Sequence, residues 1–341
     1  MALPRASSTT ADAGSYRLPP VRSTADGKPR RVGVEIEFAG LDLEVITRLV
    51  RRVFGGVEEQ DSRYAAHVRR TRLGDFRVEL DSLPLKQERH KALLERIGAG
   101  PGLTRAVDEV IEGVATQWIP HEIVAPPIAL DDLPKLEALR AALCAAGARG
   151  TRTSVFYLFG FQLNPEVPSL EAPVLLRYLR AFLALSQWLR ASIDVDTTRK
   201  LFSFADPFPD EYRALVLDRA YAPNHRQLIA DYLEHNPTRN RALDMLPAFS
   251  MIDRDEVLAK VREPDRVKAR PTFHYRLPNS LVDDPDWSFA LEWNRWVEVE
   301  SLAEDSSRLE RASGDVLRSL DRSLERDEIM TMARSWGVTA P

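Results

Sequence analysis

Glu35 and Glu37 alternate with apolar residues in the segment RRVGVEIEFAG, residues 30–40. Side chains two positions apart leave the same face of a β-strand, so both carboxylates lie on one face, about 7 Å apart. Two like charges at this spacing repel each other, and folding must compensate that cost. A shared divalent cation would do so, because hard cations prefer carboxylate oxygens.

Polar side chains recur on one face of other strand-like segments. By the same alternation, this face carries Glu79 in FRVELDS, Glu122 in IPHEIV, Gln162 and Asn164 in FGFQLNP, and His274 and Arg276 in TFHYRLPN. For any one strand, a sheet face that meets water explains the pattern. Together, however, these strands contribute carboxylates, amides, an imidazole and a guanidinium. Such a group on a concave sheet favours a site for Mg²⁺–ATP, with an arginine to neutralise the transferred phosphoryl group.

The elements that position these side chains follow a mixed pattern. Strand patterns cover residues 75–82, 118–128, 154–165 and 269–279 as well as the first segment. Helical patterns cover residues 41–56, 130–148, 172–192, shorter pieces between 205 and 265, and most of the chain after Trp287. This order predicts an α+β fold in which one curved antiparallel sheet is backed by helices.

The interior of the chain shows no clear linker. Residues 1–30 are rich in Ser, Thr, Ala, Pro and Gly, and we expect them to form a disordered or extended tail. We expect residues 31–341 to form a single domain that includes a helical C-terminal region.

The composition excludes several classes of protein. The chain has 341 residues, a net charge of -4 and 44% hydrophobic residues, which is typical of a folded protein without the basic charge of a nucleic-acid binder. The single cysteine, Cys144, excludes an intrachain disulfide. No apolar run reaches the length of a membrane span, and the N-terminus lacks the apolar core of a secretory signal. We therefore expect a cytoplasmic protein with no nucleic-acid and no membrane partner.

Five segments, in this order along the chain, resemble the amidoligase family. They are RRVGVEIEFAG, VELDS, EIVAPPI, GTRTSVFYLFGFQLNPE and TFHYRLPNS, and the resemblance runs from about Arg31 to Glu300. The family belongs to the carboxylate–amine ligases, so the resemblance implies an antiparallel sheet like the catalytic domain of glutamine synthetase, curved around an ATP site with two or more Mg²⁺ ions. The implied reaction joins a carboxylate to an amine through an acyl phosphate.

The resemblance also implies roles for single residues. Glu35 and Glu37 match the metal-binding E-x-E pair, and Glu79 and Glu122 match later acidic positions. Gln162 stands where ligase relatives often have a metal-binding His, and His274 stands where they often have Glu. Both remain expected metal ligands, because an amide oxygen and an imidazole can each bind a cation. Arg276 matches an arginine that contacts the terminal phosphate, and we expect it to act in catalysis and in nucleotide binding, with Asn164 beside the nucleotide.

The loop GARGTRTS contains two further candidates. Arg149 and Arg152 lie among small residues before a buried strand, where a loop can bind phosphate or a carboxylate. We expect Arg149 to contact the nucleotide and Arg152 to act in catalysis. The alternative is that both are ordinary surface arginines.

Three classes of function remain open from the sequence. The first is an ATP- and Mg²⁺-dependent ligase acting on small-molecule or peptide carboxylates and amines, for which a glutamine amidotransferase or a peptidase encoded nearby would be a fitting partner. The second is a hydrolase in which carboxylates act as acid and base or hold a metal. The third is a noncatalytic relative that binds a nucleotide or a partner. The sequence does not identify the acid or the amine.

Overall fold

The computed structural model describes residues 15–80, 120–151, 159–193 and 206–339. Its strands are β1 (Arg31–Phe38), β2 (Val57–Ser62), β3 (Ala65–Thr71), β4 (Gly74–Leu80), β5 (His121–Val124), β6 (Ile128–Ala129), β7 (Phe161–Pro165), β8 (Leu243–Asp244) and β9 (His274–Tyr275). Its helices are α1 (Leu43–Phe54), α5 (Glu137–Ala145), α6 (Ala172–Ile193), α8 (Asp210–Leu217), α9 (His225–His235), α10 (Leu246–Ile252), α11 (Arg254–Lys260), α12 (Phe289–Ala303), α13 (Ser306–Ser319) and α14 (Arg326–Ser335). Two short 3₁₀ helices span Leu130–Leu136 and Pro264–Arg266.

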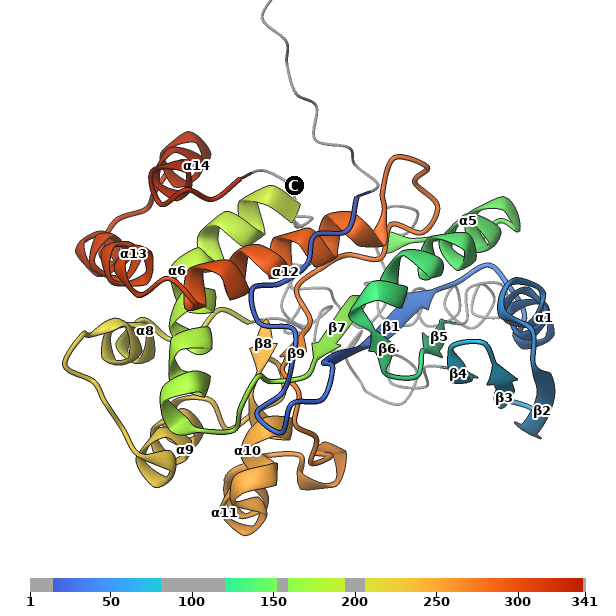
Figure 1. Cartoon of the computed structure of the whole chain (residues 1–341), viewed down its shortest axis with the longest axis horizontal. Coiled ribbons are helices and arrows are strands. Elements are labelled where there is room, and N and C mark those ends of the chain that lie inside the picture. The colour runs from blue at the N-terminus through green and yellow to red at the C-terminus, as the bar shows by residue number, and fades with distance from the viewer. Residues whose placement is uncertain (1–14, 81–119, 152–158, 194–205, 340–341) are drawn as a thin grey trace, which may run out of the picture.

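The described strands form one open antiparallel sheet, which confirms the predicted α+β fold with a curved sheet backed by helices (Figure 1). The strand order is β2-β3-β4-β5-β1-β7-β9-β8, and β6 pairs with one end of β1. The first strand of the chain therefore lies near the middle of the sheet. The pairing β4-β5-β1-β7-β9 places the polar strand positions predicted from the sequence on neighbouring strands, except for Arg276, which directly follows β9.

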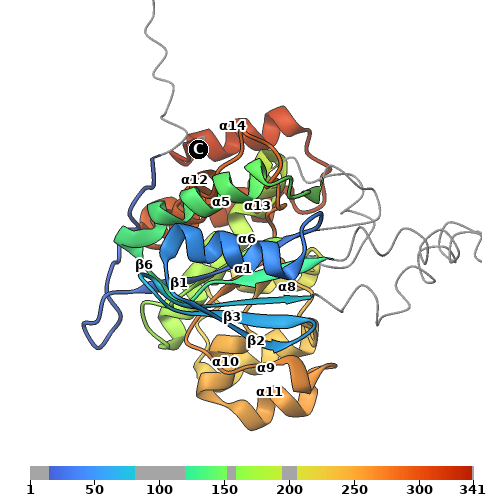
Figure 2. The same ribbon diagram turned by 90° about the vertical axis from the view of Figure 1, so that its right-hand side faces the viewer.

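The apolar face of β1 explains where the core lies. Val32, Val34, Ile36 and Phe38 are each at most 1% exposed, and they alternate with the more exposed glutamates. Figure 2 shows α1, α5 and α12 on one side of the strands and α9, α10 and α11 on the other. The apolar helix α6 packs against α12, α13 and α14. Burial of the apolar strand positions supplies the main driving force for the fold.

The described sheet contains three strands that the sequence did not predict, β2, β3 and β8, and one strand that is shorter than predicted. The strands β2 and β3 were not predicted, because their segment VEEQDS–AAHVRRT contains few large apolar residues. The predicted strand at residues 269–279 is reduced to His274 and Tyr275. Pro271 and Pro278 flank it, and proline has no N–H with which to extend a ladder.

Residues 15–22 lie in extended form along α12, and residues 23–29 form a tight turn closed by the bridge between Ser23 and Pro29. The indole of Trp293 donates to the carbonyl of Arg17 at 2.8 Å, and the amide of Asn294 donates to the carbonyl of Ser15 at 2.9 Å. At the end of this segment, Arg30 and Glu300 form a buried two-pronged ion pair with N···O distances of 2.7 and 2.8 Å. These contacts join the segment before β1 to a helix, with sequence separations of 270 to 279 residues.

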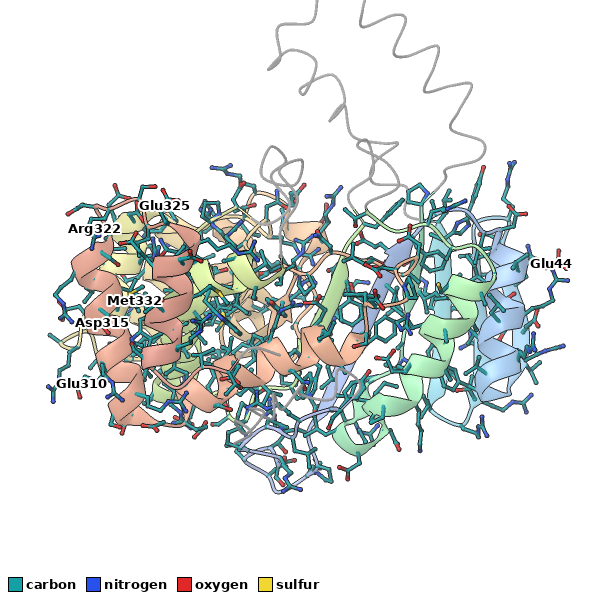
Figure 3. All side chains as sticks on the ribbon, turned by 90° about the horizontal axis from the view of Figure 1, so that it is seen from above. Glu44, Glu310, Asp315, Arg322, Glu325 and Met332 are labelled. Carbon is teal, nitrogen blue, oxygen red and sulfur yellow. The ribbon has the colours of Figure 1, made fainter. Side chains whose placement is uncertain are left out.

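The C-terminal helices lie far from α1. Figure 3 places Glu310 and Asp315 of α13 and Met332 of α14 at the opposite end of the molecule from Glu44 of α1. Within the described residues, no helix is both long enough and apolar enough to cross a membrane.

Candidate active site

Four glutamates share one face of three neighbouring strands. In the antiparallel register, Glu37 of β1 lies opposite Glu122 of β5, and Glu122 lies opposite Glu79 of β4. Directly paired residues point to the same face of a sheet, and Glu35 joins that face two positions before Glu37. We call these four residues the glutamate face.

Amide and backbone N–H groups offset the repulsion between Glu35 and Glu37. The side-chain amide of Asn164 donates to Oε1 of Glu35 at 2.9 Å, and that of Gln162 donates to Oε1 of Glu37 at 2.6 Å. The backbone N–H of Gly160 donates to Oε2 of Glu37 at 2.7 Å. Hydrogen bonds to a charged acceptor are stronger than neutral ones. In this structure the two amides therefore act as N–H donors to the carboxylates, rather than as oxygen donors.

Two glycines give these amides the space they need. A Cβ atom at Gly33 would lie 3.2 Å from Cβ of Asn164, its partner across β1 and β7. A Cβ atom at Gly160 would lie 3.3 Å from Oε2 of Glu37. Gly33 is the glycine of the G-x-E-x-E motif, so the sequence carried a signal for it. The role of Gly160 depends on the pairing of two strands.

A buried histidine fixes the orientation of Gln162. Nε2 of His274 lies 2.6 Å from Oε1 of Gln162, and its Nδ1 faces Nη2 of Arg239 at 3.5 Å and Oδ2 of Asp244 at 3.6 Å. A carboxylate only accepts, so the amide NH₂ must face Glu37 and its oxygen must accept from Nε2–H of His274. Burial lowers the pKa of His274 and outweighs the raising effects of Asp244 and Glu35.

Arg239 and Asp244 are site residues that sequence analysis missed. Nε of Arg239 lies 3.4 Å from Oδ2 of Asp244, so one guanidinium serves both the carboxylate and the imidazole of His274. Asp244 faces His274 in the pairing of β8 with β9. The strand β8 has only two residues, and such a short element leaves no periodic signal in the sequence.

Arg276 lies beside the same network. Its Nη1 donates a hydrogen bond to the backbone carbonyl of Arg239 at 2.7 Å. Burial and the positive charge of Arg239 lower the pKa of Arg276, whereas Asp244, Glu37 and Glu35 raise it. These interactions place the guanidinium within electrostatic range of the glutamate face. It remains charged at pH 7, because arginine does not lose its proton in proteins.

The two loop arginines differ in what the structure describes. Arg149 pairs with Ala39, two positions beyond Glu37, so its exposed side chain starts from the same side of β1 as the glutamates. Gly40 adopts a positive φ of 87°, and a Cβ atom there would lie 2.9 Å from Cγ of Arg149. Arg152 lies outside the described residues.

The electrostatics of the glutamate face suit a hard cation. Burial raises the pKa of Glu35, but the neighbouring His274 and Arg270 and side-chain hydrogen bonds with Glu122 and Asn164 lower it to below its ordinary value of 4.5. A hydrogen bond between two carboxyl groups needs a shared proton, and a divalent cation can take its place. Glu79 also contacts Arg77, which partly neutralises that end of the row.

The glutamates do not form a ready-made cage. Among the described residues, no group of three or more His, Cys, Asp and Glu side chains converges as metal ligands do. Mg²⁺ does not require such a group, since it keeps several waters and is usually bound by one or two carboxylates together with substrate phosphates. The carboxylate oxygens of the glutamate face therefore fit Mg²⁺ held by one or two of these glutamates together with a nucleotide.

Comparison with known proteins gave one match. A family model described as "Putative amidoligase enzyme" matches residues 28–298, which include every described residue of the candidate site. No curated protein and no solved structure matches the chain.

Proposed function

Because the chain belongs to the amidoligase family, we propose that it is an ATP- and Mg²⁺-dependent ligase that forms an amide bond between a carboxylate and an amine. The observation that carries this proposal is the glutamate face with the Arg276 guanidinium beside it. Acidic groups for a cation and a fixed positive charge for a phosphoryl group are what ATP-dependent acyl activation requires.

The proposed reaction has two steps. A carboxylate oxygen of the acid attacks the γ-phosphorus of ATP, which forms an acyl phosphate and releases ADP. The amine then attacks the acyl carbon, which forms the amide bond and releases phosphate and a proton. The substrates are a carboxylate and an amine, either small molecules or peptides, and a glutamine amidotransferase or a peptidase encoded nearby would be a fitting partner.

The residues of the chain have distinct roles in this scheme. One or two of Glu35, Glu37 and Glu122 would hold Mg²⁺, which shields the negative charge of the phosphates. Arg276 lies within electrostatic range of the same carboxylates, where it would neutralise charge on the phosphoryl group as it moves to the acid. Arg149, exposed at the end of β1, would contact the outer part of the nucleotide, and Arg152 remains a proposed catalytic residue.

A noncatalytic relative is the second candidate. The hydrogen bond between His274 and Gln162 occupies both residues that the family resemblance assigns as metal ligands. A chain that had lost turnover could bind a nucleotide through the remaining glutamates.

Thermal unfolding with nucleotides tests the proposal. A ligand that binds only the folded state raises the melting temperature by mass action. We expect ATP with Mg²⁺ to raise the Tm and ATP with EDTA to do much less. ADP release that depends on an acid and an amine would identify a ligase, whereas a Tm shift without turnover would favour the noncatalytic relative. If no nucleotide at millimolar concentration shifts the Tm, the ligase proposal is wrong.

A further inference from the structure

The sheet face of the candidate site is divided by charge. Over β1, β4 and β5 it carries the four carboxylates of the glutamate face. Over β9 and β8 it carries His274 and Asp244, together with the guanidinium groups of Arg239 and Arg276. Asp244 balances one of these guanidinium groups, so the described side chains leave an excess of positive charge at this end. A second divalent cation placed here would be repelled.

The hydrogen bonds of His274 and Gln162 leave little room for a cation at this end. Nε2 of His274 carries the hydrogen that Gln162 accepts at 2.6 Å, and Nδ1 faces an N–H of Arg239 at 3.5 Å. A cation at Oε1 of Gln162 would meet the Nε2 hydrogen beside it. Turning the amide over would point its oxygen at the carboxylate of Glu37, which accepts from Gln162 at 2.6 Å. His274 therefore cannot act as a ligand without breaking the buried network. A cation at the second lone pair of Oε1 of Gln162 would lie beside Nε2–H and near the guanidinium groups of Arg239 and Arg276, which repel it.

The network also resists rearrangement. His274 is 3% exposed and Gln162 is 6% exposed, so water cannot replace a hydrogen bond that is lost. Unpaired polar groups are costly in such surroundings. Arg239 lies at the far end of the network, with its Nη2 3.5 Å from Nδ1 of His274.

We infer that the β7–β9–β8 end of the face excludes divalent cations, so that the chain holds one divalent cation, at the glutamate face. This inference rests on the proposed function and departs from the two or more ions that the family resemblance implies. The positive charge that a second cation would supply comes here from Arg239 and Arg276. The same end is complementary to an oxyanion, such as a phosphoryl group or a substrate carboxylate.

The number of bound Mn²⁺ ions tests the inference. We would measure electron paramagnetic resonance of the full chain with Mn²⁺ and a non-hydrolysable ATP analogue. The expected result is one Mn²⁺ per chain with the spectrum of an isolated ion. The variant Glu37→Gln with Glu122→Gln should lose this ion.

A second variant tests the cause. The double variant Gln162→His with His274→Glu replaces the hydrogen-bonded pair of Gln162 and His274 by two side chains that can each offer a lone pair to a cation. This variant should bind two Mn²⁺ ions with spin–spin coupling. Gln227→His on α9 makes a similar change away from the site and should keep one ion. Circular dichroism establishes that each variant is folded.

The outcomes separate the inference from the proposed function. Two coupled Mn²⁺ ions in the unaltered chain would overturn the inference and leave the ligase proposal intact. A folded double variant that still binds one ion would show that Gln162 and His274 do not exclude the second cation. If the double variant does not fold, the count in the unaltered chain decides alone. No bound Mn²⁺ with or without the analogue would contradict both the inference and the proposed function.

Discussion

His274 and Gln162, 112 residues apart in the chain, are joined by a buried hydrogen bond of 2.6 Å. Because the imidazole donates to the amide oxygen, the amide NH₂ is left to face Glu37. The orientation of a carboxylate on β1 is thus set by a residue on β9, two strands away in the sheet.

Replacing Arg276 by Lys should lower turnover while leaving the fold intact. An ammonium group cannot present two parallel N–H donors to a phosphoryl group, so the loss should appear mainly in the transition state. We expect kcat to fall by about two orders of magnitude, the size of one well-placed electrostatic contact, with most of the ATP affinity kept. Turnover and Tm would be measured on the same preparation. An unchanged rate in a destabilised protein would make Arg276 a structural residue.

Gly160→Ala should weaken nucleotide binding more than it affects stability. The new Cβ atom would lie 3.3 Å from Oε2 of Glu37, so the carboxylate must move by a few tenths of an ångström. We expect the Tm shift produced by ATP and Mg²⁺ to shrink, while the Tm without ligand changes little. Gly314→Ala in α13 is the matched control, because alanine in a helix stabilises it by about 0.5–1 kcal/mol relative to glycine. A full nucleotide shift in the Gly160 variant would contradict the role assigned to this glycine.

Arg30→Met should destabilise the protein strongly. Arg30 and Glu300 are 1% and 0% exposed, and removing one partner of a buried pair costs about 3–5 kcal/mol because the other charge is left unpaired. Urea unfolding would give the change in the free energy of unfolding. Lys28→Met is the control, because its ion pair with Asp26 is exposed to solvent, where screening leaves little net stabilisation. Equal effects of the two changes would show that residues 15–30 do not stabilise the body of the protein.

The stability of the protein should depend on the ionisation of Glu35 in acid. The pKa of Glu35 is lowered from 4.5 in the folded state, so its ionised form favours folding above about pH 4.5, and this contribution is lost as the pH falls through the folded value. Glu35→Gln should therefore destabilise the protein at neutral pH, and the difference from the unaltered chain should shrink below about pH 4.5. Urea unfolding across this range measures it. A difference that stays constant with pH would exclude a lowered pKa at Glu35.

The sequence by itself determined the fold class and the polar strand positions. The alternation in β1 predicted which of its residues are buried, because the apolar face of a strand leaves water only by packing against other apolar groups. The same alternation identified Glu35 and Glu37, and neighbouring segments identified Glu79 and Glu122. The segments that resemble the amidoligase family lie within the residues matched by its family model. These features are local, so they can be recognised from spacing and residue type alone.

Only the tertiary structure decided which groups meet. The sequence marked Gln162 as an oxygen ligand of a metal and Asn164 as a nucleotide contact, but the register of β1 with β7 turns their N–H groups toward the glutamates. Arg239 and Asp244 join the site through a strand too short to leave a periodic pattern. A hydrogen bond depends on distance and direction between segments far apart in the chain, and residue spacing within one segment carries no information about either.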